Sequence, residues 1–160
     1  MRRVPLVAAV SAAVSAAVSA GLLAGCSAGS VQVPPPSPDE ATAARCAKLH
    51  DRLPAKLHGQ ERRTATPSSD LTAVWGDPAI ALRCGVPRPR GLRPTSQLAE
   101  INGLSWLPDP EGAPTRFTLL GRSAYVEITV PRTVKLPGEV LSQLTSAVKA
   151  TLPARPGGRL

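Results

Sequence analysis

Hydrophobic and polar positions alternate most clearly in the stretch from Ala79 to Val86, which follows the turn signal Gly76-Asp77-Pro78. This pattern predicts a strand whose apolar face carries Cys84. Residues 116–120 and 124–130 flank Gly-Arg-Ser and predict an antiparallel hairpin, and residues 98–107 predict one more strand. In the second hairpin strand we expect one face to point inward (Val126, Ile128, Val130) and the other outward (Tyr125, Glu127, Thr129).

Helical spacing occurs near both ends of the folded part. Ser37, Pro38 and Glu40 are typical of a helix start with Ser37 as the cap, and the apolar spacing continues to Leu53. A second helix is predicted over 137–151, where the apolar residues form one stripe. Residues 57–73 are polar without a period and are interpreted as a loop. We therefore expect an α+β fold: a small antiparallel sheet of about four strands with an N-terminal and a C-terminal helix.

Composition restricts this core to aliphatic side chains, because the 160 residues include two Trp, one Tyr and one Phe. The 18 prolines and 13 glycines indicate a single loop-rich domain. The net charge is +8, of which Arg2 and Arg3 contribute two, so the chain without them carries +6. Such a charge attracts anionic lipids or polymers.

Residues 1–25, up to Cys26, have the pattern of a signal peptide: Arg2 and Arg3 are followed by an uncharged run from Val4 to Ala24, which overlaps the motif Leu23-Ala24-Gly25-Cys26. The last four residues resemble the bacterial lipobox, in which the cysteine is diacylated and becomes the mature N-terminus. We expect Cys26 to be lipidated and to anchor the protein on the outer, extracytoplasmic face of the plasma membrane. An ordinary secretory leader and an uncleaved anchor are the alternatives. Export makes nucleic acid an unexpected partner.

Residues 26–38 contain three successive prolines and predict an extended tether, of which the eleven residues from Ser27 to Ser37 reach up to about 35 Å. Such a tether would hold the domain, residues 39–152, clear of the headgroups. The tail, residues 153–160, is expected to be disordered and unpacked.

Two cysteines remain after lipidation, and both fall on predicted buried faces. A Cys46–Cys84 disulfide is the simplest expectation in an oxidising compartment. The alternative is a metal site, because Cys46 and His50 are four residues apart on one helix and Cys84 could supply a third ligand. With the disulfide favoured, we expect neither a metal nor another cofactor.

The segment 86–94, VPRPRGLRP, combines three prolines with Arg88, Arg90 and Arg93. The prolines exclude regular strand pairing, so the segment predicts a basic loop. It is interpreted either as a solvated surface loop or as a contact loop for phosphate or carboxylate groups of the envelope.

Several of these motifs occur in a familiar order: Trp75-Gly76-Asp77-Pro78, Leu82-Arg83-Cys84-Gly85-Val86, Asn102-Gly103 before Trp106, and Gly121-Arg122 before a strand that ends at Pro131. Together they resemble a family of exported actinobacterial proteins known as domain of unknown function 3515, over roughly Cys46 to Leu152. The resemblance implies a membrane-attached envelope protein of high-GC Gram-positive bacteria, with no established activity or cofactor.

Catalytic signatures do not emerge from the sequence. The histidines are His50 and His58, and the chain contains no HExxH motif. We therefore expect a non-enzymatic binding or interaction module of the envelope, whose partner is an envelope protein or an anionic polymer. A metal-binding protein and a small envelope enzyme are the alternatives.

Overall fold

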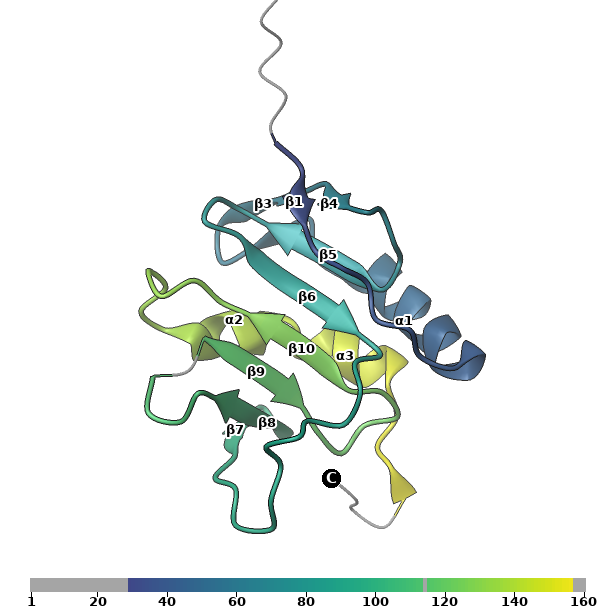
Figure 1. Cartoon of the computed structure of the whole chain (residues 1–160), viewed down its shortest axis with the longest axis vertical. Helices are drawn as coiled ribbons and strands as arrows, with labels where there is room; N and C mark the ends of the chain where they lie inside the picture. The colour runs from purple at the N-terminus through teal and green to yellow at the C-terminus, as the bar shows by residue number, and fades with distance from the viewer. Residues whose placement is uncertain (1–28, 114, 157–160) are drawn as a thin grey trace, which may run out of the picture.

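An eight-stranded antiparallel sheet forms the centre of the computed structural model, which describes residues 29–113 and 115–156 (Figure 1). The strand order is β2-β3-β5-β6-β10-β9-β8-β7, and β1 and β4 pair separately in parallel. The strands are β1 Val31–Gln32, β2 Lys56–Leu57, β3 Gln60–Arg63, β4 Ala65–Thr66, β5 Thr72–Trp75, β6 Ile80–Cys84, β7 Ala99–Ile101, β8 Leu104–Asp109, β9 Arg116–Leu119 and β10 Val126–Thr129. The helices are α1 Glu40–Arg52, α2 Pro137–Gln143 and α3 Thr145–Thr151.

The expectation of a four-stranded sheet is therefore wrong. The segment 57–73, interpreted as a loop, supplies residues to β2, β3, β4 and β5. The stretch 98–107 does not form one strand but contains the hairpin of β7 and β8, which turns at Asn102 and Gly103 with φ of 51° and 71°. Positive φ at both central residues is the geometry that makes Asn-Gly a frequent hairpin turn.

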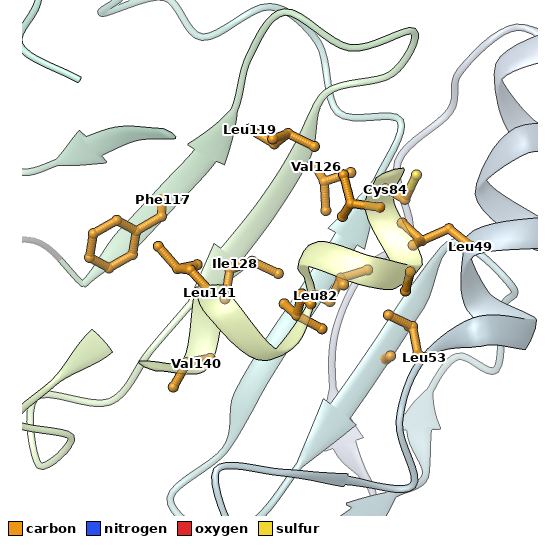
Figure 2. Packing of buried hydrophobic residues seen from close by; sticks show 14 of the residues in the cluster. Leu49, Leu53, Leu82, Cys84, Phe117, Leu119, Val126, Ile128, Val140 and Leu141 are labelled. Atoms are coloured by element: carbon orange, nitrogen blue, oxygen red, sulfur yellow. The ribbon is translucent and has the colours of Figure 1, made fainter. Parts of the chain in front are cut away.

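All three helices pack on one face of the sheet, where the main core lies (Figure 1). Leu82, Ile128 and Leu141 meet between the sheet and the helices (Figure 2). Helix α1 begins later than expected: its cap is Asp39, whose carboxylate accepts a hydrogen bond from the Thr42 amide at 2.9 Å, and not Ser37. The C-terminal helix is divided in two at Leu144.

Cys46 of α1 and Cys84 of β6 form the expected disulfide, with an S–S distance of 2.01 Å. Both residues are buried in the main core. The bond therefore fixes the first helix to a central strand of the sheet.

The proline-rich segment does not form a free tether from Gly29 onward. Residues 29–38, which we call the N-terminal strap, lie along the domain: Val31 and Gln32 pair with β4, and Val33 is only 5% exposed. The Pro34 carbonyl accepts a hydrogen bond from Arg83 Nε at 2.9 Å. Proline lacks an N–H donor, but its carbonyl oxygen can still bind the sheet.

The end of the strap lies against Gly85, which has a φ of +86°. A Cβ atom added to Gly85 would lie 2.7 Å from Cγ of Pro38. This close approach, together with the left-handed backbone, requires glycine at the end of β6.

Residues 153–156 are also bound to the domain by hydrogen bonds, contrary to the expected loose tail. Ala154 forms a bridge with Arg122, and Arg155 Nε donates to the Arg122 carbonyl at 2.7 Å. The Arg155 guanidinium lies 4.4 Å from the centre of the Tyr125 ring and donates to its hydroxyl at 2.9 Å.

The predicted leader and Cys26 lie outside the described residues. Within 29–113 and 115–156, no helix is long and apolar enough to cross a membrane.

Candidate functional site

A groove of about 650 Å³ lies between the sheet and the segment 86–98, which we call the basic loop. Its floor comes from β6, β8, β9 and β10, and its wall is the basic loop. The floor belongs to the sheet face opposite the helices, because Leu82 and Cys84, which flank Arg83 in β6, point into the main core.

Strand register places the floor residues in one row across the sheet. Leu107 of β8 is opposite Thr118 of β9, Thr118 is opposite Glu127 of β10, and Glu127 is opposite Arg83 of β6. Cross-strand neighbours on one face are close enough for their side chains to interact. The row therefore brings charged groups from separate segments of the chain into one site.

The floor carboxylates are paired with arginines. Arg83 Nη1 donates to Glu127 Oε1 at 3.1 Å, and the Arg116 guanidinium lies 3.8 Å from the other oxygen of Glu127. Arg116 also donates to Asp109, and this hydrogen bond raises the pKa of Arg116 above its already high ordinary value. The negative charge of Asp109 and Glu127 is thus balanced within the floor.

A second, smaller apolar cluster fixes the basic loop to the sheet. Leu92, in the middle of the loop, is buried with residues of the same sheet face and its flanks: Val86, Leu107, Leu120 and Tyr125. Tyr125 was expected to face solvent; it does lie on the outward face, but the Leu92 cluster and Arg155 bury it. The loop is therefore anchored although it contains no regular structure.

Arg88, Arg90 and Arg93 line the groove and are exposed. In contrast to Arg83 and Arg116, none of the three forms an ion pair with another residue of the described chain. Guanidinium groups bind phosphate and carboxylate in a planar, two-pronged geometry. The wall of the groove can therefore accept anionic groups without first breaking an internal ion pair.

The structure thus brings together the three arginines singled out in the sequence and adds a floor that the sequence did not reveal. Arg83 and Glu127 were recognised only as outward positions of two strands. Their alternation with apolar neighbours was the available signal, but the pairing of β6 with β10 was needed to join them.

The alternative metal site of Cys46, His50 and Cys84 is not formed, because the disulfide occupies both sulfur atoms. His50 instead lies 2.6 Å from Arg62, measured from Nε2 to Nη2. Burial, and then the positive charge of Arg62, lower the pKa of His50. Among the residues that the structure describes, no cluster of three His, Cys, Asp or Glu side chains could hold a metal ion.

The model of one protein family, described as "Protein of unknown function (DUF3515)", matches residues 3–157. No curated protein and no solved structure was found to match the chain.

Proposed function

The chain belongs to the DUF3515 family of proteins of unknown function, and we propose that it is a lipid-anchored envelope protein whose groove binds an anionic ligand without catalysing a reaction. The observation that carries this proposal is the contrast between the two sides of the groove. Asp109 and Glu127, the carboxylates on the floor strands, are paired, whereas Arg88, Arg90 and Arg93 have no ion-pair partner among the described residues. These three guanidinium groups outnumber Glu111, the other carboxylate that lines the groove.

The fixed position of the basic loop on the sheet supports a role in binding, as opposed to that of a solvated surface loop. Because Leu92 is buried, the three arginines are presented from a loop that is already placed beside the cavity. Less conformational entropy is then lost when a ligand binds than would be lost by ordering a free loop.

The leader and the disulfide support an envelope location. The lipobox-like Leu23-Ala24-Gly25-Cys26 predicts a diacylated cysteine, and disulfides persist mainly in oxidising compartments outside the cytoplasm. Metabolic labelling with a fatty-acid analogue tests the anchor. Label should enter the wild type and be lost in Cys26→Ala; an unlabelled wild type would refute lipidation.

Binding of inorganic polyphosphate to the full chain tests the groove. A variant with Arg88→Gln, Arg90→Gln and Arg93→Gln should lose affinity by roughly tenfold or more, equivalent to about 1.4 kcal/mol or more. Affinity of the wild type should fall as salt rises, because added ions screen exposed charges.

The matched control removes the same charge elsewhere, through Arg52→Gln, Arg132→Gln and Lys135→Gln, at exposed positions outside the groove. It should bind polyphosphate much as the wild type does. Equal losses in the two triple variants would show that net charge alone drives binding and would refute a specific groove. Thermal unfolding of each variant checks that the fold is kept.

A further inference from the structure

We infer that the groove faces away from the membrane that carries the protein, and that its ligand is an anionic polymer of the envelope rather than a phospholipid headgroup. This inference rests on the proposed function, since it takes Cys26 as the anchor. The arginines alone would bind phosphate from either source, so the orientation of the groove decides between them.

The anchor is close in sequence to a fixed part of the domain. Two residues separate Cys26 from Gly29, so their Cα atoms can be at most about 11 Å apart. From Gly29 onward the strap is bound to the domain: the Gly29 carbonyl accepts a hydrogen bond from Arg63, and Val31 pairs with β4. A lipid on Cys26 would therefore hold the β1–β4 end of the domain near the membrane.

The basic loop lies at the opposite end. In Figure 1, β1 and β4 are at the top of the domain, whereas the connection from β6 to β7, which contains the basic loop, reaches its lower end. A domain of this length is roughly 30 Å across. Electrostatic attraction to a charged surface is screened beyond about 8 Å at physiological salt, so distant headgroups would hardly act on the loop arginines.

Arg62 and Arg63 of β3, beside the β1–β4 pair, are already engaged within the domain. Arg63 donates to the carbonyls of Gly29 and Gly76 and lies 3.6 Å from the Asp77 carboxylate. Arg62 contacts His50 and lies over the ring of Trp75, 5.5 Å from its centre. The unpaired arginines of the basic loop, in contrast, are at the far end.

The spread of charge along the loop favours a ligand with repeated anionic groups. Arg88, Arg90 and Arg93 occupy three separate positions around one open groove. A polymer of phosphate or carboxylate units can contact several of them together, whereas one headgroup presents a single phosphate. Multiple linked contacts raise affinity beyond that of any single contact.

Fluorescence quenching tests the orientation with the lipidated full chain in phosphatidylcholine vesicles that contain a headgroup quencher. One fluorophore is placed through Thr64→Cys, an exposed position whose carbonyl binds the Val31 amide, and another through Thr95→Cys in the basic loop. We expect strong quenching at position 64 and little at position 95. Equal or stronger quenching at position 95, with the protein still attached, would overturn the inference. Failure of the wild type to attach would instead refute the proposed anchor.

Polyphosphate binding by the anchored protein tests the ligand source. Affinity should differ by no more than about twofold between neutral vesicles and vesicles containing phosphatidylglycerol at physiological salt, because the groove is beyond the reach of the headgroups. It should be lost in the Arg88, Arg90 and Arg93 triple glutamine variant on both. Loss of wild-type binding on the anionic vesicles alone would show that headgroups occupy the groove and would overturn the inference. Absence of wild-type binding on both would refute the proposed groove function.

Discussion

Arg83 and Glu127 face each other on adjacent central strands, and their side chains are joined by a hydrogen bond of 3.1 Å. Arg83 also donates to the Pro34 carbonyl through Nε, so a single guanidinium contacts both the N-terminal strap and the floor of the groove. The segment nearest the predicted anchor and the candidate binding site therefore share one side chain.

Replacing Glu127 by Gln should strengthen anion binding. Glutamine keeps the size of the side chain and can still accept a hydrogen bond from Arg83, but it removes a negative charge that is only 17% exposed. We expect several-fold tighter polyphosphate binding, and a loss in unfolding free energy of about 1 kcal/mol. Isothermal titration and chemical denaturation measure the two effects. Asp51→Asn, on the exposed surface of α1, is the control; an equal gain in affinity there would exclude a local role for Glu127.

Shortening Val33 should destabilise the domain. Its side chain is buried although it precedes the three prolines, so Val33→Ala is expected to lower the unfolding free energy by about 1.5 kcal/mol. The exposed neighbour Gln32 provides the control, since Gln32→Ala should change stability by less than about 0.5 kcal/mol. Urea denaturation of the full chain measures both unfolding free energies. An unchanged value for Val33→Ala would show that the segment is a free tether.

Removing the disulfide should cost substantial stability. Cys46 and Cys84 are 38 residues apart, and loop-closure entropy for that separation gives roughly 4 kcal/mol. A Cys46→Ala, Cys84→Ala variant should therefore unfold at much lower denaturant concentration. Reducing agent should shift the wild type in the same direction and leave the double variant unchanged. A wild type that does not respond to reduction under unfolding conditions would contradict this account.

Stability should also depend on His50. Its pKa is lowered in the folded state, first by burial and then by Arg62, whereas the unfolded chain takes up a proton near pH 6.5. The unfolded state therefore binds more protons as the pH falls through 6.5, and the folded state loses stability until His50 itself is protonated. Above about pH 6.5, His50 is neutral in both states, so its contribution to the unfolding free energy does not change with pH.

His50→Gln should remove this part of the pH dependence. Between pH 7.5 and 5, its unfolding free energy should fall less steeply than that of the wild type, as measured by denaturation at several pH values. Gln32→Ala, which removes no titratable group from an exposed position, serves as the control and should retain the wild-type slope. Parallel curves for the wild type and His50→Gln would contradict the lowered pKa.

The sequence was most informative where a strand has one buried face. Ile80, Leu82 and Cys84 alternate with smaller or charged residues because only one side of β6 packs against the helices, and this alternation also led to the disulfide. Strand β5 gave no such signal, since all four of its residues are buried. Strand β3, Gln-Glu-Arg-Arg, is polar, and its place in the sheet depends on pairing with β5.

The strap and the floor could not be predicted for a different reason. Three successive prolines favour an extended chain, but composition does not show whether that chain is free or bound through its carbonyls, as Pro34 is to Arg83. The floor depends on register between strands that are distant in sequence: Arg83 and Glu127 are 44 residues apart. The basic loop was visible because Arg88, Arg90 and Arg93 are close together in the sequence, although the burial of Leu92 that fixes the loop was not.

Gly85 provides a marker for the strap in other chains of the family. Any side chain at this position would collide with the ring of Pro38 and would have to adopt an unfavourable backbone conformation. A family member with a bulky residue here could not hold its N-terminal segment as this protein does. If such a protein carried the lipid anchor proposed above, its domain could rotate about that anchor, and its groove would have no fixed orientation relative to the membrane.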